Sequence, residues 1–133
     1  MRILTLAALL VSGAALAQER MTPDELTDYV EGKTFRFETE DGTYQGSEQY
    51  LPDNRVIWQF VTGECLHGLW YEKGKAICYV YEGDDAEHCW LVLRDEAGMI
   101  IRALDPGPDA DPDYYESGQN NIPLSCVGPA LGI

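Results

Sequence analysis

Basic residues are scarce in this sequence. Its 9 Lys and Arg residues are outnumbered by 23 Asp and Glu residues, which gives a formal net charge of −14 at pH 7. A chain this acidic repels nucleic acids and anionic membrane surfaces, so the composition argues against both as partners. The excess of carboxylates predicts a solvated surface that keeps the protein soluble, with a basic protein as the alternative partner.

Long apolar segments are missing from the sequence everywhere except at the N-terminus. There, Arg2 precedes an apolar stretch over residues 3–11, and Ala15 and Ala17 form the small-x-small pattern of a signal-peptidase site. The stretch is too short to remain as a membrane-spanning helix. We therefore predict a signal peptide over residues 1–17, a mature protein that is periplasmic or secreted, and no membrane insertion after the signal is removed.

Connections long enough to hold a crossover helix are also missing from residues 34–104, where turn signals separate short aromatic and β-branched runs. Neighbouring runs are therefore predicted to pair as antiparallel strands. Such a meander of about seven or eight strands has to curl into a barrel or fold into a sandwich. We predict that residues 18–133 form one all-β domain, an up-and-down meander closed into a small barrel. The strands are expected over residues 34–39, 43–51, 55–61, 65–72, 76–82, 87–94 and 99–104.

The segment before the meander predicts one short helix, over residues 22–32. Thr22 is a favourable N-cap, Pro23 suits the first helical position, and Glu25 completes a capping box. A helix this short is marginal alone, so it must pack on the barrel.

The segment after the meander, residues 105–133, is predicted to be an acidic loop followed by a strap. Residues 105–118 are rich in Pro, Asp and Gly, which is typical of a loop. The alternating aspartates at 109–113 resemble the start of a calcium loop, but the Gly and Glu that such a loop requires are missing. Residues 120–127 are expected to return as a short edge strand or as an outer strap.

Loop lengths fix the strand register, and this register sorts the large aromatic side chains onto one face. Trp58 is expected opposite Gly68 and Trp70 opposite Ile77, and the glycines at 46 and 68 leave room for crossing rings. This face is predicted to be the barrel interior. Its members are Phe35, Phe37, Tyr50, Val56, Trp58, Phe60, Leu66, Trp70, Ile77, Tyr79, Tyr81, Trp90, Val92 and Ile101.

The four cysteines are an even number, which in an oxidising compartment indicates two disulfides and no free thiol. The register makes Cys78 and Cys89 direct cross-strand neighbours, within bonding reach. Cys65 lies too far along its strand to reach Cys78, so we predict that it pairs with Cys126. The other two pairings remain open at this point.

Two histidines next to cysteines, His67 and His88, invite a zinc hypothesis. On the predicted register His67 points outward and His88 inward, so they cannot converge on one ion. We therefore predict no metal and no other cofactor.

Glu48 is the most unusual residue of the predicted interior. Strand parity over residues 43–51 places Tyr44, Gly46, Glu48 and Tyr50 on the aromatic face. A carboxyl group among rings needs hydrogen-bond donors, or water at a barrel mouth.

Glu48 has three possible interpretations: structural, ligand-binding and catalytic. The first two remain open. It is either a structural residue, bonded to Trp58, Tyr50 or Tyr79, or the polar anchor of a ligand site. In the second case Glu48, Trp58, Tyr79 and His88 are the expected ligand-binding residues. Hydrolysis by Glu48 and His88 lacks an accompanying nucleophile motif, so no catalytic residue is predicted.

One resemblance supports this fold. The chain contains the pattern Cys65-x-x-Gly68-x-Trp70-Tyr71, then Ile77-Cys78-Tyr79-x-Tyr81-Glu82, then Cys89-Trp90. Over residues 32 to 104 it resembles an uncharacterised family of small exported β proteins of proteobacteria, known as a domain of unknown function. The resemblance implies a small lipocalin-like barrel outside the cytoplasm and assigns no activity.

The leading functional hypothesis is a non-enzymatic, exported protein that binds a small amphipathic molecule. The alternative is a protein-interaction module, an inhibitor or envelope accessory protein that uses its acidic surface. A filled interior would favour the interaction module, and an interior cavity open at one end would favour ligand binding. A wet cleft joining Glu48 and His88 would favour an enzyme.

Overall fold

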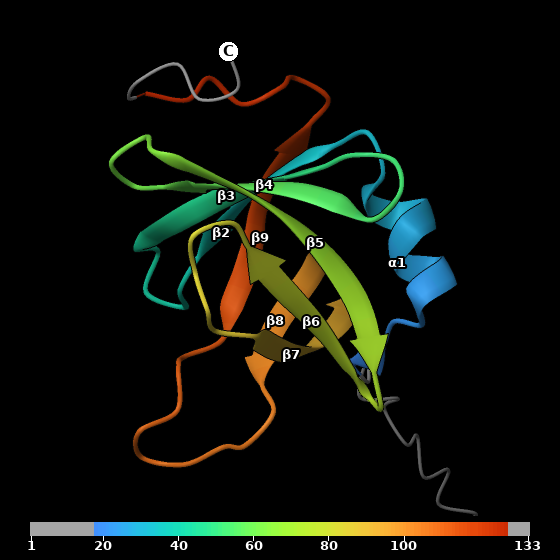
Figure 1. Ribbon diagram of the computed structural model, residues 1–133. Helices are drawn as coiled ribbons and strands as arrows, with labels where there is room; N and C mark the ends of the chain where they lie inside the picture. Colours follow the sequence, from blue (N-terminus) through green and yellow to red (C-terminus); the bar gives the residue numbers. More distant parts are fainter. Residues whose placement is uncertain (1–17, 128–133) are drawn as a thin grey trace, which may run out of the picture.

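The computed structural model describes residues 18–127, and the predicted signal peptide at 1–17 lies outside the described residues. These residues form a closed antiparallel barrel of eight strands, with one extra strand and one short helix (Figure 1). The elements are β1 (Glu19–Arg20), α1 (Pro23–Val30), β2 (Thr34–Glu38), β3 (Tyr44–Tyr50), β4 (Arg55–Phe60), β5 (Cys65–Lys73), β6 (Ala76–Tyr81), β7 (His88–Asp95), β8 (Gly98–Ala103) and β9 (Tyr114–Asn120).

The barrel closes because β9 pairs with β2 on one side and with β8 on the other. The prediction of a loop over residues 105–118 is therefore wrong in its last part. Tyr114 and Tyr115 are good strand formers, and the edges of β2 and β8 offer unpaired backbone groups to them. The pairing with β8 is short, with Ile100 opposite Tyr115 and Ile101 opposite Tyr114.

Most of the predicted strand pairing is confirmed. Phe37 lies opposite Gly46, Glu48 opposite Trp58, and Tyr79 opposite His88. Two hairpins differ from the prediction by two residues, since Trp58 pairs with Leu66 and Gly68 pairs with Tyr81.

The two differences arise in the turns. In the β4–β5 loop the Phe60 N–H donates to the Glu64 carbonyl and the Gly63 N–H to the Phe60 carbonyl, so the turn spans residues 61–63 and begins one residue earlier than predicted. The β5–β6 turn falls at Gly74 and Lys75, because Gly74 adopts a left-handed φ of 59°. A shift of two residues keeps every side chain on its predicted face.

The helix α1 begins where the sequence predicts. The Thr22 side chain accepts a hydrogen bond from the Glu25 N–H at 3.2 Å, and the Glu25 carboxylate accepts one from the Thr22 N–H at 3.4 Å. Leu26 and Val30 are fully buried in the same apolar cluster as Phe35. Within residues 18–127, no helix has both the length and the apolar composition needed to cross a membrane.

The position of α1 defines the two ends of the barrel. The backbone just after α1 bonds to the last residue of β3, where the Gly32 N–H donates to the Tyr50 carbonyl. Just before α1, β1 pairs with the C-terminal half of β7. The helix therefore covers the end where β3 and β7 finish, on the right of Figure 1. The loops β2–β3, β4–β5, β6–β7 and β8–β9 surround the opposite, open end.

Both predicted disulfides are confirmed. Cys78 and Cys89 join across β6 and β7, and Cys65 at the start of β5 joins Cys126. Two disulfides are consistent with an oxidising, exported environment.

Residues 121–127 form the predicted outer strap rather than a strand. The Leu124 N–H donates to the Gln49 side chain, and the Val127 N–H donates to the Gly63 carbonyl at 2.9 Å. Together with the Cys65–Cys126 bond, these contacts fix the β4–β5 loop at the rim of the open end.

Candidate ligand-binding site

A hollow of about 180 Å³ lies inside the barrel at its open end. All eight barrel strands contribute to its wall, and the loop β6–β7 adds one residue. The lining consists of Phe37, Glu48, Tyr50, Trp58, Phe60, Leu66, Tyr79, Tyr81, Asp84, His88, Trp90, Ile101 and Tyr114. Phe60 is 41% exposed, which places it at the rim. The hollow is therefore a mostly aromatic chamber that reaches the surface on the side away from α1.

Two glycines shape the wall of this hollow, as the sequence predicts. A Cβ atom on Gly46 would overlap the indole ring of Trp58, and one on Gly68 would lie 2.7 Å from the Tyr81 ring. Gly46 also has a φ of 153°, which side chains disfavour. Trp58 and Tyr81 can lie close to the strands only because both positions lack a side chain.

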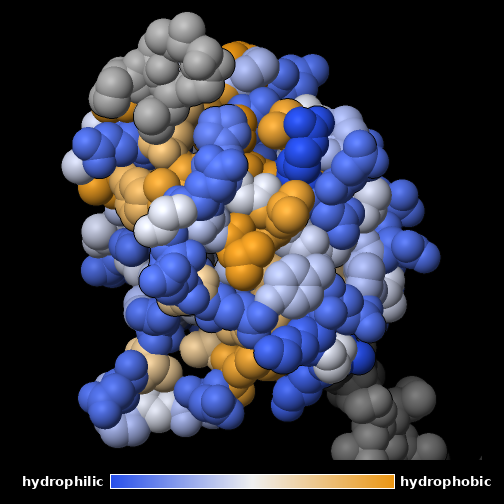
Figure 2. Space-filling model, in the orientation of Figure 1, coloured by the Kyte–Doolittle hydropathy of each residue, from blue (hydrophilic) through white to orange (hydrophobic). Residues whose placement is uncertain are grey.

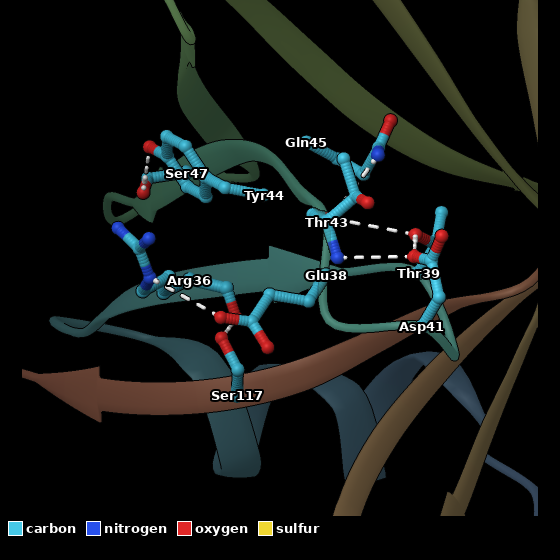
Figure 3. A network of polar contacts seen from close by, with 9 residues as sticks. All are labelled: Arg36, Glu38, Thr39, Asp41, Thr43, Tyr44, Gln45, Ser47 and Ser117. Carbon is cyan, nitrogen blue, oxygen red and sulfur yellow. Dashed lines mark hydrogen bonds and ion pairs between the residues drawn. The ribbon is translucent and has the colours of Figure 1, made fainter.

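A β-bulge next to Gly46 corrects one detail of the predicted interior. The pairing of β2 with β3 shifts between Phe37 and Glu38, and this shift turns Tyr44 to the outer face. There the Tyr44 hydroxyl bonds the Ser47 hydroxyl at 2.8 Å, and the Arg36 guanidinium lies 3.8 Å from the Tyr44 ring centroid (Figure 3). The parity prediction is right for Glu48 and Tyr50 and wrong for Tyr44.

The turn β2–β3 beside this bulge is held by Asp41. Its carboxylate accepts hydrogen bonds from the Thr39 hydroxyl at 2.6 Å and from the Thr43 N–H at 3.1 Å (Figure 3). These bonds stabilise the ionised carboxylate and lower the pKa of Asp41. The rim of the open end therefore carries a fixed negative charge at this turn.

All four residues predicted as ligand-binding line the hollow. Glu48 and Trp58 are cross-strand neighbours on β3 and β4. Tyr79 is 4% exposed, and its hydroxyl shares a 2.9 Å hydrogen bond with the Tyr50 hydroxyl. His88 lies nearer the rim, where its Nε2 is 2.7 Å from the Asp84 carboxylate.

Glu48 is the polar centre of the site. Its side chain is buried, with a relative exposure of 2%, and its Oε1 accepts a hydrogen bond of 2.7 Å from the Tyr81 hydroxyl. Its Oε2 is buried and has no hydrogen-bond partner among the described residues. Burial raises the pKa of Glu48 to about 8, and the Tyr81 hydrogen bond opposes part of that rise. An unpaired oxygen is therefore available inside an aromatic chamber.

The residue that holds Glu48 was not predicted. We expected Trp58, Tyr50 or Tyr79 to donate to it, whereas the donor is Tyr81. The two-residue shift of the β4–β5 and β5–β6 hairpins explains the error, because it places Tyr81 above Gly68. The strand alternation did place Tyr81 inside, so correct turn assignments would have identified it.

Two further lining residues were also missed. Tyr114 belongs to β9, which was predicted to be a loop, and Asp84 belongs to the loop β6–β7. The adjacent residues Tyr114 and Tyr115 favour a strand, and they were the sequence signal that could have identified β9. The hydrogen bond from His88 lowers the pKa of Asp84, which keeps this carboxylate ionised at the rim.

The chemistry available in the hollow is binding and proton exchange. Desolvation raises the pKa of Tyr50, Tyr79 and Tyr81, so these hydroxyls stay neutral and act only as hydrogen-bond partners. Among the described residues that line the hollow, none is Ser, Thr or Cys. Elsewhere, Cys78, Glu87 and Cys89 lie close together, but the two sulfurs are bonded to each other and are not thiolate ligands.

A scan against protein-family models and searches of curated proteins and of solved structures found no match for this chain. The resemblance to an exported family of unknown function therefore stays a prediction. The function has to be argued from the chemistry of the hollow.

Proposed function

We propose that this protein is an exported, non-enzymatic binding protein that holds one small amphipathic molecule in the open end of its barrel. The observation that carries the proposal is Oε2 of Glu48, a buried oxygen without a partner on the wall of an aromatic hollow. Buried polar atoms are nearly always paired in folded proteins. A bound molecule that forms a hydrogen bond or an ion pair with Glu48 would satisfy this oxygen.

The dimensions of the hollow limit the size of the molecule. Pockets for drug-sized ligands span roughly 300–1,000 Å³, whereas this hollow measures about 180 Å³. It suits one ring or a short branched chain with a single polar group. The polar group would face Glu48 while the apolar body packs on Trp58 and Tyr79.

The state of the interior supports a ligand site over an interaction module. Aromatic side chains fill the barrel at the α1 end, where Phe35 packs against Tyr50 with ring centroids 5.7 Å apart. At the open end the rings line a space instead of filling it.

Native mass spectrometry of the protein purified from its own cells tests this function. We expect a mass above that of the chain by one small molecule, because the hollow is open to solvent and holds an unpaired polar atom. The Glu48→Gln variant is expected to lose that molecule. The variant Glu40→Gln, the same chemical change on the exposed β2–β3 loop, should keep it.

A bare mass for the wild-type protein would contradict the proposal. Equal retention by the Glu48→Gln variant would also contradict it, because the molecule would then be held away from Glu48.

A further inference from the structure

We propose that the molecule is a small organic cation, a protonated amine on an apolar body, whose ammonium group pairs with Glu48. This inference rests on the proposed function and adds to it the chemical class of the ligand. Three independent features of the open end point to a positive charge.

The first feature is the set of groups around Glu48. Tyr81 donates one hydrogen bond to it, while the hydroxyls of Tyr50 and Tyr79 bond each other. From the other elements, Trp58, Leu66, Ile101 and Tyr114 carry no charge, and Asp84 and His88 pair with each other near the rim. Within residues 18–127, no Lys or Arg lines the hollow. A positive partner that would allow this buried carboxyl group to ionise must therefore come from outside the chain.

The second feature is the aromatic wall beside the carboxyl group. The rings of Phe37 and Trp58 lie 6.5 Å apart at their centroids, and those of Trp58 and Phe60 lie 6.4 Å apart at 88°. Ring faces attract cations through their quadrupole, Trp most strongly, and the attraction increases when water is excluded. An ammonium group next to Glu48 would contact the Trp58 indole, its cross-strand neighbour.

The third feature is the charge of the rim. The four loops around the open end, residues 39–43, 61–64, 82–87 and 104–113, each carry at least one carboxylate, and none contains Lys or Arg. In Figure 1 these loops lie on the left, away from α1. In the same orientation, hydrophilic residues cover most of the surface on that side (Figure 2). Charges of one sign around an apolar opening concentrate the opposite ion and speed its entry.

Binding of such a cation is coupled to a proton. In the empty hollow the buried Glu48 carboxyl keeps its proton at neutral pH, since burial disfavours the charged form. When the ammonium group enters, the carboxyl gives its proton to the solvent and forms an ion pair with the cation. A neutral ligand leaves the carboxyl protonated and releases no proton.

Calorimetric titration at pH 7 with three probes of one shape tests the inference. The probes are phenethylamine, 2-phenylethanol and 3-phenylpropanoate, which are positive, neutral and negative. We expect phenethylamine to bind about tenfold more tightly than 2-phenylethanol. Titrations in two buffers of different ionisation enthalpy should show release of about one proton per phenethylamine and none with the alcohol.

Two variants locate the source of the effect. Glu48→Gln keeps the shape of the side chain and its bond to Tyr81, and it should abolish both the preference for the amine and the proton release. Glu40→Gln removes one rim charge and should keep both. Proton release by the wild-type protein is informative even if the Glu48→Gln variant proves unstable.

The outcomes separate the inference from the function on which it rests. If the alcohol or the acid binds as well as the amine, the ligand is not a cation, although the hollow remains a binding site. Tight amine binding without proton release, or unchanged in the Glu48→Gln variant, would also overturn the inference. If none of the three probes binds, both proposals fail.

Discussion

The free energy of unfolding is expected to fall by about 3–4 kcal/mol between pH 5 and pH 8, and Glu48 is the cause. Burial raises the pKa of its carboxyl group from 4.5 to about 8 in the folded protein. In the unfolded chain the group is exposed to water and keeps its ordinary value. Each unit of difference in pKa corresponds to about 1.4 kcal/mol.

The sign of the effect follows from counting protons. Between pH 4.5 and pH 8 the folded protein holds the Glu48 proton and the unfolded chain has lost it. Stability falls with rising pH wherever the folded state binds more protons. The contribution is therefore complete below pH 4.5 and is lost as the pH approaches 8. The lowered pKa values of Asp41 and Asp84 act in the opposite direction and only below pH 4, outside this window.

Urea melts at several pH values between 5 and 8 measure this dependence. The Glu48→Gln variant has no titratable group at position 48, so its stability should change much less over the same pH range. The Glu40→Gln variant, altered at an exposed carboxylate, should follow the wild-type protein. Parallel curves of stability against pH for the wild-type protein and the Glu48→Gln variant would contradict this account. They would show that Glu48 does not have the raised pKa of a buried carboxyl group that lacks a charged partner.

The Trp70→Ala variant is expected to lose about 4 kcal/mol of stability. Trp70 is 4% exposed and belongs to the main apolar cluster, and it lies opposite Tyr79 on the inner face. Replacing a buried Trp by Ala removes apolar contacts and leaves a cavity, at a cost of about 3–5 kcal/mol. Urea melts at one fixed pH give the difference directly.

A matched control for Trp70 lies on the same strand. His67 on β5 is exposed and points outward, so His67→Ala should change stability by less than about 0.5 kcal/mol. If His67→Ala proves the more destabilising of the two variants, the inner and outer faces of β5 have been exchanged.

The barrel could be predicted largely because strand parity tolerates errors in register. The β4–β5 and β5–β6 hairpins each slip by two residues, yet Trp58, Trp70 and Tyr79 all remain inside. A slip of one residue would have reversed the faces. The Cys78–Cys89 disulfide followed from the same reasoning, because the two residues sit in a hairpin whose register was predicted correctly.

Other features depend on information that local patterns do not hold. The strand β9 forms because it can pair with the edges of both β2 and β8. The local sequence of residues 105–118 contains no information about those distant edges. The bulge that turns Tyr44 outward lies next to Gly46, and it depends on the close approach of Trp58 to this glycine from the neighbouring strand. The partner of Glu48 depends on the positions of the β4–β5 and β5–β6 turns, so its burial was predictable and its bond to Tyr81 was not.

Carbon-13 NMR of the Glu48 side-chain carboxyl group tests the ligand site most directly. In the ligand-free protein the resonance should titrate with a midpoint near pH 8, as expected for a buried carboxyl group. With phenethylamine added, the resonance should have the chemical shift of an ionised carboxylate at pH 7. A midpoint near 4.5 in the ligand-free protein, with no response to phenethylamine, would contradict a buried, unpaired carboxyl group in a cation-binding hollow.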